Sequence, residues 1–421
     1  MNIFNPIRYF FRKLLYQWLI LLGLLMLTVI ASCQSIEQPV SQVQRIENPA
    51  AENARFPYLS PLPDGAVLMS WVEELNDGHA LKFAVYRHGQ WEKQGEAAQG
   101  AGWFVNWADF PAVTAIDASF WVAHWLVRSA GGSIYDYDIL VAVSTNAGIS
   151  WSMSQTPYQD RTAAAHGFVS IFPVDRDAGI VWLDGRNYIK HKSGSFALRY
   201  VRIHRDGSFA AEQLIDDSTC SCCRTAAAAT TATGPVIAWR SLREHSVRDH
   251  HIARLLQNRW TTPLPLSQES WSMDGCPVNG PALAIRGEHI VASWFTAEGN
   301  RPRVRAAFSS IDRLQFRKTF EVDEAKPAGR IKIEWLNDHA AVVMWLTAMD
   351  NATKKASVAV RKIFIDGTMS PIKRLIDISS GRDSGIPQLI KNESDFMLAW
   401  TSAAPGYGVQ TVRLPLEVLA Q

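Results

Sequence analysis

A tryptophan recurs at the end of short apolar segments about every 55 residues, and this spacing constrains the fold more than any other feature of the chain. The segments are AVLMSW, FWVAHW, GIVW, PVIAW, HIVASW, AAVVMW and DFMLAW, ending at Trp71, Trp125, Trp182, Trp239, Trp294, Trp345 and Trp400. Successive tryptophans lie 51 to 57 residues apart. A repeat of this length, built of short β-rich pieces, is typical of a β-propeller or a solenoid.

Each repeat has the same internal order. An opening strand such as GFVSIFPV precedes the tryptophan strand, and a variable loop and a hairpin such as YVRIHRDGSF follow it. The Asp-Gly tip of that hairpin favours a tight two-residue turn. Two tandem β-sandwiches are the competing interpretation, but they do not require so regular a period. We therefore predict an all-β fold, a β-propeller of four-stranded blades.

The number of hairpins bears on how the ring closes. Seven tryptophan strands are present but only six full hairpins, because the last repeat ends at VQTVRLPL without an outer strand. Seven blades are predicted, with six as the alternative. A segment between Ser35 and Ala54 is the candidate for the missing strand.

The N-terminus has the composition of an export signal. Residues 1–32 carry Arg8, Arg12 and Lys13 and no acid, followed by the apolar run LLYQWLILLGLLMLTVIA. An uncleaved membrane anchor is the alternative, since the run is long enough to span a bilayer. The segment VIASC resembles the bacterial lipobox. This resemblance implies that Cys33 is lipidated and becomes the first mature residue.

These features predict three parts of the chain: a lipoprotein signal peptide at 1–32, a polar tether at 33–54 that includes the candidate ring-closing strand, and a single propeller domain at 55–421. Gln34 follows the lipidated cysteine, which in enteric-type lipoproteins resembles an outer-membrane address. We expect an outer-membrane lipoprotein, periplasmic or surface-exposed, whose first partner is the membrane.

Charge argues against nucleic acid as a partner. The chain has 42 Lys and Arg residues and 40 Asp and Glu residues, and residues 1–32 hold three of the basic ones. The mature chain therefore has 39 basic and 40 acidic residues, a net charge of −1, which gives no electrostatic basis for binding nucleic acid. The sequence has no phosphate-binding glycine loop and no zinc-protease motif, and we expect no cofactor.

One hairpin resembles a known family. STNAGISW, Ser144 to Trp151, resembles the Asp box of sialidase-like (BNR-repeat) propellers, with Asn146 in place of aspartate. SSIDRLQF, around Asp312, is a degenerate copy without the glycine. Arg55, Phe56 and Pro57 resemble the Arg-Ile-Pro that opens the first sialidase strand. The resemblance implies that the Asp-box residues are scaffold and that Arg55 lies at a ligand site.

The starts of the opening strands and the loops after the tryptophan strands share one face of a propeller. Arginine offers a two-pronged donor for carboxylates or sulfates, and two carboxylates can cleave a glycosidic bond. The segments WLDGRN and WRSLREHSVRD place arginine and aspartate together on this face, which also holds Arg224 and Arg330. The ligand-binding candidates are Arg55, His166, Arg186, Arg240 and Arg248, and the catalytic candidates are Asp109, Asp184, Asp249 and Tyr407.

Two functions remain open on this basis. One is a glycoside hydrolase (exo-sialidase-like) or a polysaccharide lyase that acts on acidic glycans. The other is a non-catalytic propeller that binds a glycan or an envelope protein. The departures from the sialidase pattern favour the second function, and the charged face favours the first.

Four of the five cysteines lie in two segments that lead into neighbouring repeats. TCSCC contains Cys220, Cys222 and Cys223, and SMDGCPVNGP contains Cys276. Adjacent blades bring these leads to one face, so the segments can meet. Four thiols suit zinc or copper(I), but export favours disulfides. We predict Cys220–Cys223 and Cys222–Cys276 bridges and no metal.

The lipobox resemblance yields the first prediction. Replacing Cys33 with alanine removes the sulfur that would carry the lipid, so the protein should leave the membrane fraction or remain unprocessed. Membrane fractionation and the mass of the product measure this. A Cys33→Ala protein of mature size that still sediments with membranes would contradict the lipoprotein prediction.

Overall fold

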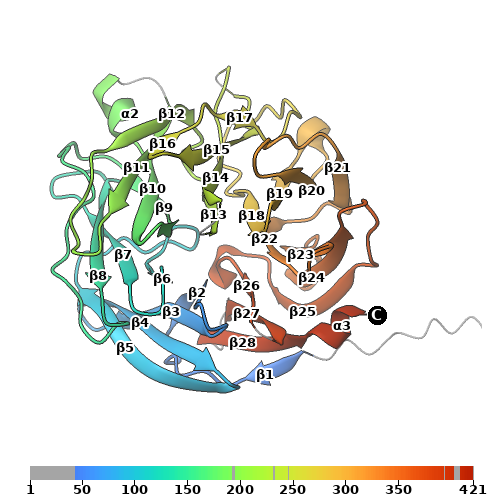
Figure 1. Cartoon of the computed structure of the whole chain (residues 1–421), viewed down its shortest axis with the longest axis horizontal. Helices are drawn as coiled ribbons and strands as arrows, with labels where there is room; N and C mark the ends of the chain where they lie inside the picture. The colour runs from blue at the N-terminus through green and yellow to red at the C-terminus, as the bar shows by residue number, and fades with distance from the viewer. Residues whose placement is uncertain are drawn as a thin grey trace, which may run out of the picture. The chain divides into compact units, whose positions relative to one another are not determined.

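A computed structural model describes residues 43–191, 195–230, 233–244, 246–392, 394–402 and 408–420, within the compact unit Gln42–Gln421. In these residues, seven antiparallel sheets stand around a central axis as the blades of a propeller (Figure 1). The prediction of an all-β propeller with seven blades is confirmed, and the six-blade alternative is wrong. Residues 1–42, which hold the expected signal peptide and Cys33, lie outside the described residues.

The first three blades follow one another along the chain from the inner strand to the rim. Blade 1 consists of β2 (Arg55–Pro61), β3 (Val67–Leu75), β4 (Gly78–Arg87) and β5 (Gln90–Gly100). Blade 2 consists of β6 (Ala112–Ala115), β7 (Trp121–Arg128) and β8 (Tyr137–Ser144), with a single bridge from Gln155 to Val141 at its rim. Blade 3 consists of β9 (His166–Val174), β10 (Asp177–Asp184), β11 (Phe196–Ile203) and β12 (Gln213–Thr219).

The next three blades repeat this order. Blade 4 consists of β13 (Ala226–Thr230), β14 (Gly234–Arg240) and β15 (His250–Leu256), and its rim is divided between β16 (Arg259–Trp260) and β17 (Leu264–Pro265). Blade 5 consists of β18 (Ala282–Arg286), β19 (His289–Thr296), β20 (Arg303–Ser310) and β21 (Thr319–Asp323). Blade 6 consists of β22 (Gly329–Trp335), β23 (Ala340–Leu346), β24 (Lys355–Phe364) and β25 (Lys373–Ser379).

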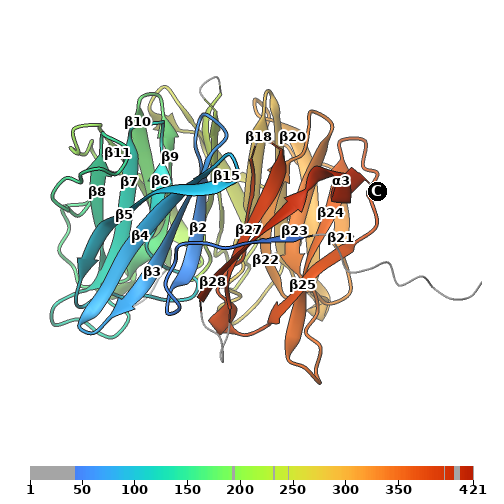
Figure 2. The same ribbon diagram turned by 90° about the horizontal axis from the view of Figure 1, so that it is seen from below.

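The seventh blade takes strands from both ends of the described chain. It consists of β26 (Gln388–Lys391), β27 (Asp395–Ser402), β28 (Gly408–Pro415) and β1 (Gln44–Ile46). Strand β1 pairs antiparallel with β28, with Gln44 opposite Arg413 and Ile46 opposite Thr411 (Figure 2). The short helices are α2 (Arg186–His191), α3 (Leu416–Ala420), η1 (Glu298–Asn300) and η2 (Arg382–Ser384). No helix among the described residues is long and apolar enough to cross a membrane.

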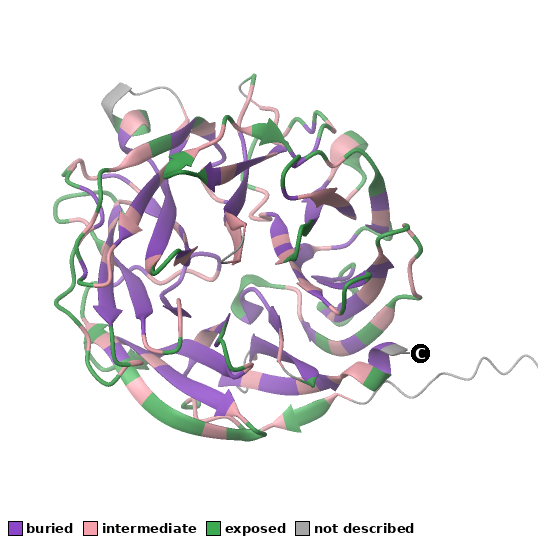
Figure 3. Ribbon diagram, in the orientation of Figure 1, coloured by how far each residue is buried: buried purple, intermediate pink, exposed green. Residues whose placement is uncertain are grey.

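Burial explains why the tryptophan strands are continuous apolar runs. Every residue of β23 is buried, whereas β5 at the rim is mostly exposed or half-buried (Figure 3). A central strand packs against blades on both faces, so both of its faces are apolar. Seven clusters of buried side chains, one between each pair of neighbouring blades, join the described residues into a ring.

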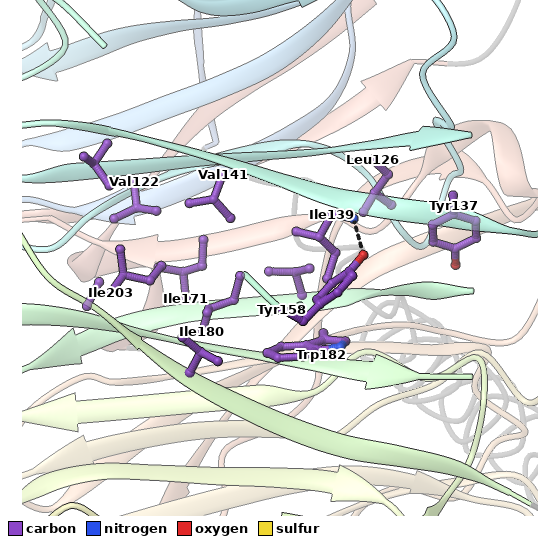
Figure 4. Close-up of a cluster of buried hydrophobic side chains, with 14 of the residues drawn as sticks. Val122, Leu126, Tyr137, Ile139, Val141, Tyr158, Ile171, Ile180, Trp182 and Ile203 are labelled. Atoms are coloured by element: carbon purple, nitrogen blue, oxygen red, sulfur yellow. Dashed lines mark hydrogen bonds between the residues drawn. The ribbon is translucent and has the colours of Figure 1, made fainter. Parts of the chain in front are cut away.

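Figure 4 shows one of these inter-blade clusters, between blades 2 and 3. Trp182 and Tyr158 lie against Ile139, Ile171 and other aliphatic side chains. The Tyr158 hydroxyl accepts a hydrogen bond from the backbone N–H of Ile139 at 3.1 Å. The segment that crosses the rim of blade 2 is thereby fixed to the blade although it forms no continuous fourth strand.

Five of the seven repeat tryptophans satisfy their buried indole N–H in the same way, by donating it to a carboxylate. In blades 1 and 3 the carboxylate lies two residues further along the same strand, and in blades 4, 5 and 6 it comes from the preceding blade. The pairs, with their N–O distances, are Trp71–Glu73 (2.8 Å), Trp182–Asp184 (2.8 Å), Trp239–Asp216 (2.7 Å), Trp294–Glu269 (2.7 Å) and Trp345–Asp323 (2.6 Å).

The Asp-box hairpin has the structural role that the sequence resemblance implied. The Ser144 hydroxyl accepts the N–H of Gly148 at 2.8 Å and donates to Asn146 at 2.9 Å. The same Asn146 oxygen accepts the N–H of Ser150 at 2.9 Å, and Trp151 packs against Phe83. Gly148 has a φ of +79°, a backbone angle that glycine adopts without steric cost.

The pairing of β1 with β28 yields the second prediction. Deleting residues 34–47 exposes the edge of β28 and removes the ladder hydrogen bonds of β1, each worth roughly 1 kcal/mol. We expect the melting temperature to fall by roughly 2–6 °C. A chain lacking only residues 34–42 retains β1 and is the matched control. Equal melting temperatures for the two deletions would contradict a stabilising role for β1.

Candidate functional site: the mouth of the central channel

One end of the channel, here called the mouth, is formed by the starts of the inner strands. Antiparallel pairing brings the ends of the tryptophan strands to the same end, with Asp184 opposite His166 and Gly329 opposite Leu346. The face expected from the sequence is therefore assembled. Strand register alone places its residues there, since every inner strand runs the same way along the axis.

A cavity of about 530 Å³ occupies the channel. Much of its wall is small or aliphatic, including the alanines of β13 at 226–229. Its charged and phenolic side chains are Tyr58, Arg224, Arg330, Lys332 and Glu334. An apolar wall with a few polar groups is the usual composition of a ligand site.

Arg224 is a cation of this wall with a guanidinium nitrogen that lacks a hydrogen-bond partner among the described residues. This nitrogen, Nη1, is buried. The guanidinium lies over the ring of Phe110, 4.5 Å from its centroid. Burial lowers the pKa of Arg224, while Tyr58 and Asp109 oppose that effect. A buried, charged donor without an acceptor is costly, so this position favours an incoming anion.

Lys332 and Glu334 lie further along β22, on the side that faces the cavity. Burial, followed by the charge of Arg224, lowers the pKa of Lys332 to about 7. Burial raises the pKa of Glu334 to about 7, against the opposing effect of Lys332. The charge of the channel wall therefore changes near neutral pH.

Arg330, another arginine of the mouth, already has hydrogen-bond acceptors for its guanidinium. Arg330 donates to the carbonyls of Ser380, Gly381 and Gly385 and to the hydroxyl of Ser384. Arginines held in this way fix loops and have little capacity left for a ligand carboxylate.

Arg240, a ligand-binding candidate from sequence, is held in the same way. It is 1% exposed and donates to the carbonyls of Asn279, Arg248 and Phe295. The structure thus places Arg240 in the interior between blades 4 and 5, out of reach of a ligand in the channel.

Asp184 and Arg186, the pair expected from WLDGRN, are buried together. Asp184 accepts hydrogen bonds from Trp182 and from Arg186 Nη2 at 2.8 and 2.6 Å. Arg186 also bridges to Glu212 at 3.1 Å. Each group therefore satisfies another, and Asp184 lies outside the lining of the channel cavity with its oxygens already accepting hydrogen bonds.

His166 is fully buried beside this pair. Its ring stacks on Tyr158 with centroids 4.5 Å apart, and its Nδ1 lies 3.2 Å from the carbonyl oxygen of Tyr137. The other ring nitrogen, Nε2, lies 3.8 Å from Asp184. The side chain is enclosed on all of these sides, so the structure does not present it to a ligand.

Asp109 is the candidate carboxyl with the most perturbed pKa. It is 2% exposed and accepts the N–H of Phe168 at 2.8 Å and the hydroxyl of Tyr137 at 3.1 Å. Burial raises the pKa of Asp109 to about 6. Gly167 is required beside it, because a Cβ there would lie 2.1 Å from the Asp109 carboxylate.

The remaining candidates are spread around the mouth. Asp249 accepts the N–H groups of Ser270 and Trp271 and so holds a loop. Arg248 donates to the carbonyl of Met273 and to the sulfur of Cys220, at 3.0 and 3.2 Å.

Arg55 and Tyr407 complete the set of candidates. The Arg55 guanidinium lies 3.7 Å from Glu74 at an exposed position. Tyr407 lies outside the described residues. Sequence reasoning therefore assembled the correct face but did not single out Arg224, Lys332 or Glu334 as its unpaired groups. The alternation in RIKIEW was the available signal for the last two.

The two cysteine segments meet as expected. The Cys220 sulfur lies 3.7 Å from that of Cys222 and 3.6 Å from that of Cys223, and Cys276 lies within hydrogen-bonding reach of Cys222. All four are free thiols in this structure, and the 3.6 and 3.7 Å separations exceed the disulfide bond length of about 2.05 Å. The bridges expected from the sequence stay a prediction.

Comparison with known proteins agrees with the fold. No protein-family model and no curated protein matches the sequence. Among solved structures, the chain resembles the BP39L lectin from Burkholderia pseudomallei, with a TM-score of 0.54 and 10% identity over 86% of this chain and 96% of that one. A protein of unknown function from Dyadobacter fermentans gives a TM-score of 0.48 with 11% identity, over 90% and 99% of the two chains. A sialidase from Streptococcus pneumoniae gives 0.46 with 12% identity, over 90% and 72%.

The chain is a seven-bladed β-propeller that carries an Asp-box-like hairpin. Of Arg224, Arg240 and Arg330, only the half-buried Arg224 has a buried guanidinium nitrogen without a hydrogen-bond partner among the described residues.

The raised pKa of Asp109 yields the third prediction. The unfolded carboxyl has a pKa of about 3.9, so between pH 6 and 4 the folded chain binds a proton that the unfolded chain lacks. The free energy of unfolding of the wild type should therefore rise relative to Asp109→Asn as the pH falls from 7 to 4, by about 2–3 kcal/mol. Urea unfolding of both proteins at each pH measures it. Parallel pH profiles would contradict the raised pKa.

Proposed function

We propose that this protein is a non-catalytic binding propeller of the cell envelope that holds an acidic group of a glycan in its central channel. The observation that carries the proposal is the unpaired guanidinium of Arg224, buried in the cavity wall. A carboxylate or sulfate would satisfy its Nη1 and offset the cost of burying the charge.

The surroundings of Arg224 support an organic anion over a simple salt ion. Tyr58 offers a hydroxyl in the same cavity, and the alanines at 226–229 leave space beside it. Lys332 adds a second cation whose pKa lies at about 7. A sugar ring has both apolar faces and hydroxyl groups, so this mixed lining suits a uronic acid, a sialic acid or a sulfated sugar.

The carboxylates support binding over catalysis. Asp184 accepts from Trp182 and Arg186, and Asp249 accepts two backbone N–H groups. Most glycosidases need two carboxyl groups that face the same bond, and Glu334 is the one carboxyl group among the described residues that line the cavity. A propeller of similar fold, the BP39L lectin, is also a binding protein by its name.

Glycoside hydrolysis remains the second candidate, and Asp109 is the residue that favours it. A carboxyl group with a pKa of about 6 is suited to act as a general acid. Its two hydrogen bonds and its burial oppose that role, since a substrate oxygen would have to displace Tyr137 to reach it.

Anchoring in the outer membrane through Cys33 is part of the same proposal. The lipobox-like VIASC and the charged, acid-free start of the chain support it. An anchored propeller facing the periplasm or the surface would meet envelope glycans or an envelope protein, so a lipid anchor suits a binding role.

The fourth prediction tests the binding site. Arg224→Gln should weaken binding to an acidic oligosaccharide about 10- to 100-fold, because a charged hydrogen bond is lost. Binding is measured by calorimetry, after a screen of sialylated, uronic-acid-containing and sulfated glycans with their neutral counterparts. Lys332→Gln tests the second cation, and melting curves show whether each variant folds.

Arg313→Gln is the matched control, since it removes the same charge from an exposed turn between β20 and β21. Binding of neutral glycans alone, or equal losses in Arg224→Gln and Arg313→Gln, would contradict the proposal. Release of a reducing sugar that stops in Asp109→Asn would instead support the hydrolase.

A further inference from the structure

Three of the four thiols at the mouth are arranged as a set of metal ligands, and the fourth, Cys276, lies outside this set beside Cys222. The sulfur atoms of Cys220, Cys222 and Cys223 all lie within 4.8 Å of one another, and Cys276 reaches Cys222 from the next blade connection. We propose that these four cysteines bind one Zn²⁺ ion as a tetrathiolate site. The site is separate from the Arg224 cavity and does not depend on the function proposed for it.

The sulfur separations fit a tetrahedral ion. Zn–S bonds of about 2.3 Å in a tetrahedron hold neighbouring sulfur atoms about 3.8 Å apart. The observed separations from Cys220 are 3.7 Å to Cys222 and 3.6 Å to Cys223. Two independent disulfides require only that each sulfur approach one partner, whereas Cys220 approaches two of them equally. A shared central ion accounts for this convergence.

The charges around the thiols also fit. Arg240 is fully buried and donates its hydrogen bonds to carbonyl groups, and Arg248 donates to the sulfur of Cys220 at 3.2 Å. Among the described residues, no carboxylate lies within ion-pair distance of either arginine. Four thiolates around Zn²⁺ carry a net charge of −2, which the two guanidinium groups would balance. Two disulfides would carry no charge and would leave Asp249, whose pKa is raised by burial against the opposing charge of Arg240, as the nearby compensating group.

Hydrogen bonds around the cysteines would hold the metal ligands in position. The N–H of Cys220 donates to the carbonyl of Arg240 at 3.0 Å. Arg248 holds Met273, three residues before Cys276, through its carbonyl. Cys276 is exposed, so an ion can enter from the solvent side.

The site would join three connections of the ring. Cys220 to Cys223 lie between β12 and β13, Arg248 lies between β14 and β15, and Cys276 lies between β17 and β18. Residue Gly280 approaches Arg224 so closely that a Cβ there would lie 1.9 Å from the Arg224 carbonyl oxygen. A metal ion here would thus fix the backbone on both sides of Arg224.

The fifth prediction is the metal content. The full chain carrying Cys33→Ser has no cysteine outside the cluster, so thiol counts refer to the site alone. Purified without chelator or reductant, it should contain one zinc ion per chain by elemental analysis. Zinc-edge X-ray absorption should show four sulfur neighbours at about 2.3 Å. Four thiols should react once the denatured protein is treated with chelator.

Two outcomes would overturn the proposal. Two disulfides, seen as the absence of reactive thiols in the denatured, unreduced chain, exclude the tetrathiolate site. The proposal of a zinc site would also be wrong if the chain held one copper(I) ion and no zinc, even after growth in excess zinc. These measurements are made with all four cysteines of the cluster unchanged, so they do not depend on whether a cluster variant folds.

Variants then test the ligands. Cys276→Ser removes one of the four ligands, so its zinc affinity should fall by more than the roughly 10-fold expected for loss of a supporting contact. Arg248→Gln removes only the supporting donor and should lower zinc affinity about 10-fold. Arg301→Gln, which changes an exposed arginine directly after η1, is the matched control and should retain one zinc ion per chain. Full zinc in Cys276→Ser would overturn the four-cysteine site.

A chelator separates the metal from a bridge. It should lower the melting temperature of the Cys33→Ser chain by about 5 °C or more, since binding energy contributes to folding, and a reductant should leave it unchanged. The opposite pattern would indicate disulfides. Glycan binding by Arg224 is measured separately, so loss of zinc with retained glycan binding, or the reverse, tells the two proposals apart.

Discussion

The packing of one blade against the next is the constraint on which the rest of this structure depends. Each tryptophan strand is buried on both faces, and the large indole rings fill the space between blades. An indole has one polar group, its N–H, and burying it unpaired would cost roughly 1–3 kcal/mol. The protein meets this requirement with carboxylates, as at Trp239 with Asp216 and Trp345 with Asp323. In blades 4 to 6 the acceptor comes from the preceding blade, so the same hydrogen bond also sets how neighbouring blades meet.

This requirement changes the meaning of the charged residues at the mouth. Asp184 seemed suited to catalysis by its position after a tryptophan strand, but it accepts from Trp182 and pairs with Arg186. The guanidinium groups of Arg240 and Arg330 are also occupied, because they donate hydrogen bonds to backbone carbonyls. A few charged residues lack such structural hydrogen bonds. Arg224, Lys332 and Glu334 face the cavity with few or no partners, and this separates a candidate ligand site from its scaffold.

The cysteine cluster lies where three blade connections converge, and it has charges of its own to balance. Arg240 and Arg248 bring two positive charges to a region where, among the described residues, no carboxylate lies within ion-pair distance of either guanidinium. A thiolate–metal centre would supply the compensating negative charge and tie the connections together. The proposed glycan site and the proposed metal site are therefore neighbours with distinct chemistry. They are linked through the backbone of Cys223 and Arg224, which are adjacent in the sequence.

The sequence by itself determined the propeller, the number of blades and the face on which charged residues gather. It did so because a period of about 55 residues and the in-and-out alternation of strands are properties of the chain alone. It also placed Cys220, Cys222, Cys223 and Cys276 near one another, since adjacent repeats lead to the same face. Only the tertiary structure decided which charged groups are satisfied. Arg224 and Arg240 both lie at the mouth end of a blade 4 strand, Arg224 just before β13 and Arg240 at the end of β14. Arg240 finds carbonyl acceptors on other segments, whereas Arg224 Nη1 finds no acceptor among the described residues. This difference depends on contacts between residues distant in the chain, which no local pattern encodes.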